Sequence, residues 1–117
     1  MSRDDGQARF DDHVGAVIRQ YSGIDGALVA QLIAESQYDP ATLEEFHRRF
    51  WDARRDSVRA LIERGKTEGE ISTDADAAPV ATIIYAPIYQ RLLFKDGPLD
   101  AAFARDLVAL ALSGVSA

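Results

Sequence analysis

Hydrophobic residues recur at helical spacing along almost the whole chain. The first stripe has the i, i+4, i+7, i+8, i+11 spacing of an amphipathic helix and consists of Phe10, Val14, Val17, Ile18 and Tyr21. We expect Gly23 to end this helix and the polar residues 1–9 before it to be flexible. A second helix is predicted over 24–38, and Pro40 follows it as a stop. Its expected inward positions are Ile24, Leu28 and Leu32.

The third predicted helix, over 40–68, is the longest. Pro40 suits a first helical turn, and Glu44 and Glu45 suit the positive end of the helix dipole. Gly69 is placed to cap the other end. The apolar stripe of this helix consists of Leu43, Phe46, Phe50, Val58 and Leu61.

The fourth predicted helix, over 74–94, is apolar around nearly its whole circumference. Asp74 or Asp76 is its expected N-cap, Pro79 suits its first turn, and Pro87 should kink it. A helix that is apolar on every side must be covered on every side. In so short a chain, we expect one face to pack internally and the other to need a second subunit.

A fifth helix is predicted over 100–113. Its larger apolar residues form one edge, and small residues form a neighbouring strip that would permit close helix approach. No segment has the alternation of a strand. The pattern therefore predicts a single all-α domain over 1–117 with about five helices.

Composition and charge exclude several classes of function. The chain has 47% hydrophobic and 27% charged residues, which is typical of a globular domain, and no run long enough to span a bilayer. The N-terminus is too polar for a signal peptide, so we expect a cytoplasmic protein without a membrane partner. The net charge of -6 argues against a surface that grips nucleic acid, because such a surface needs a basic stripe.

Two motifs resemble chemical sites. The stretch "ALIERGKT" contains the Gly-Lys-Thr of a phosphate loop, but Ala60 replaces the first glycine, and Gly65 falls at a helix C-terminus, where the dipole repels anions. Glu44 and His47 form a Glu-x-x-His pair, but His13 lacks the partner residue that a second metal-binding copy needs. We expect no metal, no cofactor and no enzymatic activity, since no nucleophile setting is recognisable either.

Two charged residues fall on apolar faces. Arg54 lies between Phe50 and Val58 in the third predicted helix, and Glu35 lies on the inward side of the second. One interpretation is a buried ion pair between the two. The alternative is that one of them is the polar anchor of a mostly apolar pocket.

The segments "LIAESQYDPATLEEFHRRFWDARRDSVRALIERGKTEGEIS" and "DADAAPVATIIYAPIYQRLLFKDGPLDAAFARDLVALAL" together resemble the C-terminal regulatory domain of tetracycline-repressor (TetR) family transcription regulators. The shared features are the Asp39–Pro40 break, the paired Arg54 and Arg55, the "ERGKTEGEI" turn and the "APIYQRLLFKDGPLD" segment. Gln90 stands where a second tyrosine is common. The resemblance covers about residues 27–112.

The resemblance implies an all-α domain that binds a small, mostly apolar effector and forms a homodimer through a four-helix bundle of its last two helices. The family's pocket residues vary, so the helical pattern supplies the candidates. Those for the ligand pocket are Glu35, Phe46, Phe50, Trp51, Arg54 and Tyr85. Those for the dimer interface are Tyr89, Leu92, Leu93, Ala104, Val108 and Ala111.

The family's N-terminal helix-turn-helix domain has no counterpart in this sequence. We therefore expect this chain to be a piece of a longer regulator, which contacts operator DNA only through the missing N-terminal domain. In that regulator, a repressor by expectation, the chain would be the sensing domain. The alternative is a free-standing helical dimer that binds a small molecule or heterodimerises with full-length regulators.

Overall fold

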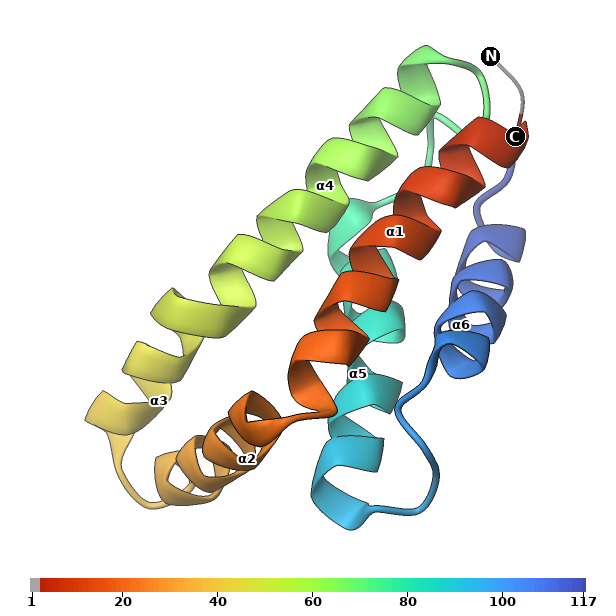
Figure 1. Ribbon diagram of the computed structural model, residues 1–117. Coiled ribbons are helices and arrows are strands. Elements are labelled where there is room, and N and C mark those ends of the chain that lie inside the picture. Colours follow the sequence, from red (N-terminus) through yellow and green to blue (C-terminus); the bar gives the residue numbers. More distant parts are fainter. Residues whose placement is uncertain (1–2) are drawn as a thin grey trace.

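The computed structural model describes residues 3–117, and they form an all-α fold (Figure 1), as predicted. The helices are α1 (Arg3–Tyr21), α2 (Ile24–Ser36), α3 (Pro40–Phe46), the π-helical segment η1 (His47–Trp51), α4 (Asp52–Thr67), α5 (Ala77–Phe94) and α6 (Ala101–Ser113). Within this described part, the one strand-like feature is an isolated antiparallel bridge between Ile71 and Ser116. None of its helices has both the length and the apolarity needed to cross a membrane.

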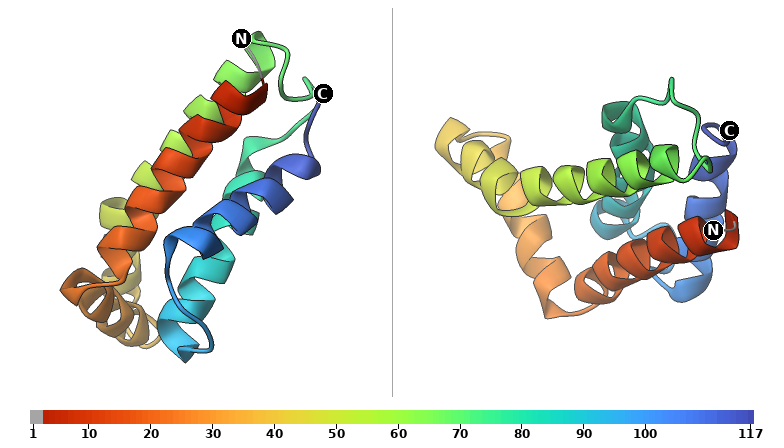
Figure 2. Two further views of the ribbon diagram at one scale, coloured as in Figure 1. Left: turned by 45° about the vertical axis from the view of Figure 1, so that its right-hand side comes forward. Right: turned by 90° about the horizontal axis from the view of Figure 1, so that it is seen from above.

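The helices form two layers, with α1 beside α4 in one and α5 beside α6 in the other (Figure 2). Helices α2 and α3 make a corner at one end of the molecule, whereas the start of α1, the end of α4 and the C-terminus meet at the opposite end. The core fills the space between the layers. Its most deeply buried aliphatic side chains are Val14, Ile18, Val58, Ile62, Ile84, Ile88 and Val108.

Aspartates define three helix starts. Asp39 accepts a hydrogen bond from the Ala41 amide at 3.0 Å, and Asp76 accepts one from the Ala78 amide at 3.2 Å. Asp100 does the same for α6. Each carboxylate satisfies an amide that the helix itself leaves unpaired. The predicted starts of the third and fifth helices and the Asp76 alternative for the fourth are thereby confirmed.

The "GKT" segment is the end of α4, as the sequence predicted. Gly65 lies inside the helix, and its carbonyl accepts hydrogen bonds from the amides of Glu70 and Ile71. Gly69 has a φ of 78°, the left-handed conformation that glycine adopts without strain after a helix. A Cβ at Gly65 would lie 2.5 Å from Ile71 Cδ1, so this glycine permits close packing rather than phosphate binding.

Residues 1–9, which we expected to be flexible, are helical in the part that the structure describes, because α1 begins at Arg3. Tertiary contacts support this polar turn. Arg9 pairs with Glu68 at 2.7 Å and with Glu70 at 3.4 Å. Positions 1 and 2 lie outside the described residues.

The inward face predicted for α2 is wrong at two of its three positions. Ile24 and Leu28 are 80% and 60% exposed, whereas Gly26 and Val29 are buried. Leu32, the third, is half-buried and packs against the core. A Cβ at Gly26 would stand 1.9 Å from the Tyr21 carbonyl oxygen. The tight α1–α2 corner therefore accepts only glycine, and this contact determines which side of α2 turns inward.

Three predicted interface residues, Ala104, Val108 and Ala111, are buried within the chain, each at most 6% exposed. The physical reason is that α1 lies directly along α6 and covers the strip of small residues. Leu92 of α5 is likewise only 8% exposed. These four side chains therefore offer little exposed surface to a second subunit.

Candidate functional site

Aromatic side chains gather where the third predicted helix changes its winding. The segment η1 interrupts the helical run between α3 and α4 with a π-helical turn. Such turns change the register at which side chains leave the axis, and they occur often at functional sites. Phe46 stacks on Phe50 with ring centroids 5.8 Å apart, and Trp51 is brought to the same side of the helix as this pair, against α5.

Tyr85 and Tyr89 of α5 complete this aromatic group. They are four residues apart and therefore share one helix face. Trp51 meets the edge of the Tyr85 ring at 5.7 Å and lies 6.4 Å from the Tyr89 ring. Tyr89 also meets Phe46 at 5.9 Å. Aromatic pairs in these edge and tilted geometries fix the positions of the rings.

The hydroxyl groups of these tyrosines belong to a buried polar network. Tyr85 donates to the Arg54 backbone carbonyl at 3.2 Å. Its single proton is thus used, so the short bond to His13 has the His13 Nε2–H as donor. Tyr21 and Tyr89 share a hydroxyl–hydroxyl bond of 3.1 Å.

Burial shifts the titration of this network. It raises the pKa of the Tyr85 and Tyr89 phenols far above the usual value for tyrosine. It lowers the pKa of His13, and the positive charge of Arg54 lowers it further. The network is therefore neutral at physiological pH except for Arg54.

Arg54 lies behind the aromatic group rather than in an ion pair. Its guanidinium carbon is 4.7 Å from the centre of the Tyr21 ring, a cation–π contact, and Nη2 donates to Gln20 Oε1 at 2.8 Å. Glu35 is exposed and accepts from Gln31 on its own helix. The interpretation of a Glu35–Arg54 ion pair is wrong, because the buried face of α2 is the opposite one.

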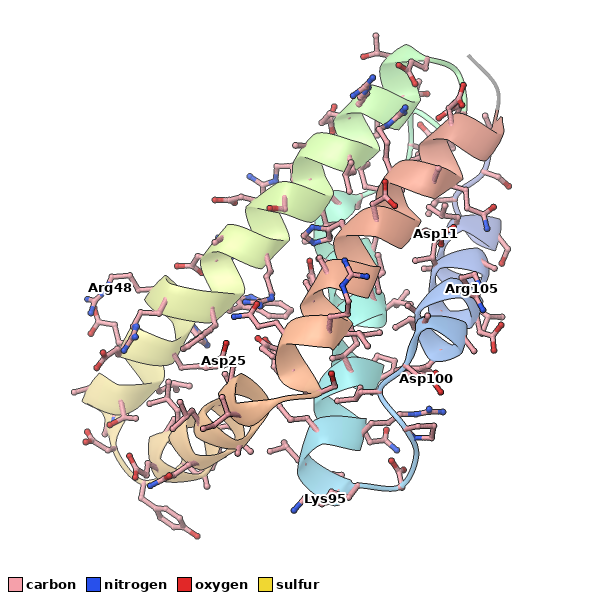
Figure 3. The ribbon with its side chains drawn as sticks, in the orientation of Figure 1. Asp11, Asp25, Arg48, Lys95, Asp100 and Arg105 are labelled. Atoms are coloured by element: carbon pink, nitrogen blue, oxygen red, sulfur yellow. The ribbon has the colours of Figure 1, made fainter. Side chains whose placement is uncertain are left out.

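A cleft of about 320 Å³ opens over the aromatic group, between α2, the α3–η1 segment and α5. Its lining residues are Ile33, Ser36, Gln37, Leu43, Phe46, Trp51, Thr82, Ala86, Tyr89 and Leu93. None of them carries a charge. Figure 3 shows two nearby cations, Arg48 and Lys95, at the outer edges of the molecule.

The structure brings together most of the predicted pocket residues. Phe46 and Trp51 line the cleft, Phe50 stacks against Phe46, and Tyr85 lies behind Trp51. Arg54 is close to the cleft without lining it, and Glu35 is not among its lining residues.

Tyr89 and Leu93, predicted at the dimer interface, also line the cleft. Ile33 and Ser36 also line the cleft but were not predicted to do so, because the sequence pattern indicated a different inward face of α2. The role of His13 was not predicted either. The four-residue spacing of Tyr85 and Tyr89 was the available signal that both belong to one site.

Comparison with known families identifies the domain. Residues 4–111 match the model of the "Tetracyclin repressor-like, C-terminal domain". The chain belongs to this TetR family. The resemblance drawn from the sequence is thereby confirmed.

Two relatives agree with this assignment. The chain is 32% identical over 105 residues to YdeS, an uncharacterized HTH-type transcriptional regulator of Bacillus subtilis (strain 168), covering 90% of this chain and 53% of that protein. The crystal structure of the TetR family transcription regulator SCO0332 superposes with a TM-score of 0.70 at 27% identity, over 78% of this chain and 50% of the other. The chain spans about half the length of these relatives.

Proposed function

We propose that this TetR-family domain is the effector-sensing and dimerisation domain of a transcriptional regulator, in keeping with a repressor. The observation that carries the proposal is the uncharged, aromatic-walled cleft between α2, the α3–η1 segment and α5. A cleft of this size and lining is typical of small-molecule sites, which are mostly apolar with a few placed polar groups.

The ligand that fits is small, mostly apolar and neutral. Phe46 and Trp51 offer flat surfaces for an aromatic or alicyclic body. Ser36 and Tyr89 supply hydroxyl groups, which already bond to Ile33 and Tyr21 within the chain. A carboxylate would enter without a cation to pair with it, which is costly in an apolar site.

The proposed dimer surface is the outward face of α5 with the adjoining edge of α6. Ile83 and Phe94 of α5 are 55% and 75% exposed, and Leu110 of α6 is 73% exposed. The guanidinium carbon of Arg91 in α5 lies 3.7 Å from the centre of the Phe103 ring in α6. Leu110 lies two turns after Phe103 on the same edge of α6, so this edge adjoins α5. The exposed positions of α5 are Ala78, Pro79, Thr82, Ile83, Ala86, Gln90, Leu93 and Phe94, none of them charged.

The cleft and this dimer surface share one helix. Ala86 and Leu93 line the cleft, and Ile83 and Gln90 are their neighbours on the outward face. A ligand that moves α5 therefore changes the contact between subunits. Such a shift in a shared element is how a sensing domain alters the spacing of attached DNA-binding domains.

We assign no DNA contact to this domain itself. Its net charge of -6 opposes phosphate binding, which depends on clustered cations. Operator DNA would be contacted by a part of the regulator that this chain does not include.

The test of ligand binding uses the emission of Trp51, the single tryptophan of the chain. Neutral aromatic compounds of the size of coumarin are titrated into the protein, and we expect saturable quenching of Trp51 with a rise in Tm. Ala86→Phe fills the cleft and should abolish the effect, whereas the matched control Ala78→Phe, on the same helix outside the cleft, should retain it. Quenching that survives Ala86→Phe would contradict the site.

Light scattering over a dilution series tests the dimer. We expect twice the 12.8 kDa mass of one chain. Ile83→Glu and Leu110→Glu should give folded monomers, because they place charges on the proposed surface. Leu28→Glu changes an exposed apolar residue on α2 and should remain dimeric. Dimers of unchanged stability in both former variants would refute the surface.

A further inference from the structure

A second cavity lies at the end of the molecule opposite the α2–α3 corner. Its volume is about 330 Å³, and it is enclosed by the first turns of α1, the end of α4, the segment after α4 and the end of α6. No sequence pattern predicts this end cavity, since its walls come from four separate segments. It shares no lining residue with the cleft over Trp51.

The walls of the end cavity are mostly apolar and contain one buried carboxylate. The cation Arg9 and the polar residues Gln7, Ser113 and Ser116 also line it. Phe10 and Ile71 are buried, and Leu61 and Leu112 are half-buried. Glu70 also lines the cavity, with only 7% of its side chain exposed. A buried carboxylate amid apolar residues is costly unless donors satisfy both of its oxygens.

The two oxygens of Glu70 differ. Oε2 accepts from Arg9 Nη2 at 3.4 Å and packs against Gly6, where any Cβ would overlap it. Oε1 is buried and receives no hydrogen bond from any residue that the structure describes. Arg9 makes its shorter bond, 2.7 Å, with Glu68. Glu70 therefore retains acceptor capacity next to an apolar cavity large enough for a small molecule.

We propose that the end cavity is a second ligand site, which takes a small primary amine with an aromatic or alkyl body. The ammonium group donates to Glu70, and the apolar body contacts Phe10, Leu61 and Leu112. A charged donor facing a carboxylate makes a stronger hydrogen bond than a neutral one. This site is chemically distinct from the uncharged cleft and does not depend on it.

The chemistry is tested with three probes of one shape on the full 117-residue chain: 2-phenylethylamine, 2-phenylethanol and 3-phenylpropionate. We expect the amine to raise Tm by several degrees at saturation and to bind about tenfold or more tightly than the alcohol, with the carboxylate weakest. Equal binding of amine and alcohol would overturn the role of Glu70.

The location is tested by amide NMR shifts and by variants. The amine should shift the amides of Gly65, Glu70 and Ile71 and leave Trp51 emission unchanged. Glu70→Gln should weaken binding about tenfold, because it removes the charge and keeps the shape. Ala109→Phe fills the cavity from an exposed position of α6 and should abolish binding, whereas Ala102→Phe on the same helix should not.

Several results would count against the site. Amine binding that persists in Ala109→Phe, absence of shifts around Gly65, or quenching of Trp51 would each overturn the assignment. Because the cleft is read through Trp51 and blocked by Ala86→Phe, failure of the end cavity and failure of the proposed effector cleft are separate outcomes.

Discussion

The space between the two helix layers and the cleft beside the α2–α3 corner are built from different side chains. Between the layers, aliphatic residues such as Val14, Ile84 and Val108 are fully buried and have no polar atoms to satisfy. At the cleft, aromatic rings carry hydroxyl groups in a hydrogen-bonded network, and about 320 Å³ is left unfilled. Dense aliphatic packing contributes stability, whereas rigid rings around open space make a binding surface. The difference indicates that the first region carries stability, and it supports the proposal that the second binds a ligand.

The largest effect is expected from a charge in the aliphatic core. Val108→Asp buries an unpaired carboxylate at a position with no exposure, and we expect a loss of about 4 kcal/mol or more in the free energy of unfolding. Leu110→Asp, two residues later on the exposed side of α6, should change the stability of one subunit by less than about 0.5 kcal/mol. Urea denaturation followed by circular dichroism measures both. Equal losses would remove the distinction between the two sides of α6.

Truncation to alanine compares the two regions directly. Ile84→Ala should cost about 2–5 kcal/mol, because it leaves a cavity in a filled core. Leu43→Ala removes a cleft-wall side chain that is already 39% exposed and should cost less than about 1 kcal/mol. The same denaturation experiment gives both values. A larger loss of unfolding free energy in Leu43→Ala than in Ile84→Ala would mean that the cleft wall contributes more to stability than the aliphatic core.

The hydroxyl network gives a smaller effect. Tyr85→Phe removes one partner from His13 and one from the Arg54 carbonyl, for an expected cost of about 2 kcal/mol. Tyr89→Phe breaks only the bond with Tyr21 and should cost about 1 kcal/mol. Thermal unfolding of the two variants measures the difference, and the reverse order would contradict the assigned donors.

The smallest effect is a pH dependence from His13. Burial and Arg54 lower its pKa in the folded state, so the unfolded chain binds the proton more readily. Stability is therefore fully present above the unfolded pKa of about 6.5 and falls as pH decreases toward the lower folded value. His13→Gln should reduce this slope, as measured by Tm between pH 8 and 5. If Tm of the His13→Gln variant changes with pH as steeply as that of the unmodified chain, the pH dependence comes from groups other than His13.

The sequence predicted the helices well because their signals are local. The spacing of Phe10, Val14 and Ile18 predicted α1, and Asp39 and Asp76 cap the helices that follow them. These features act within one or two turns, so they can be recognised without knowing the neighbours of a helix.

The candidate site was predicted only in part. Phe46 was found because it lies in the apolar helical stripe, and Trp51 because it follows Phe50 of that stripe. The π-helical turn that sets their positions has no such local pattern. The burial of Ala104 and Val108 within the chain was not predicted, because no pattern in α6 shows that α1 will lie against it.

Local sequence patterns were enough to predict the helical class, the starts of the helices that Asp39 and Asp100 cap, the glycine-terminated end of α4 and the resemblance to TetR regulatory domains. The packing of the helices against one another determines which face of α2 turns inward and which side of α6 remains exposed. It also brings Arg54 to Tyr21 instead of Glu35. Local structure follows from backbone geometry and hydrogen bonds over a few residues. Burial depends on close approach between distant segments, such as Gly26 against the Tyr21 carbonyl at the tight α1–α2 corner.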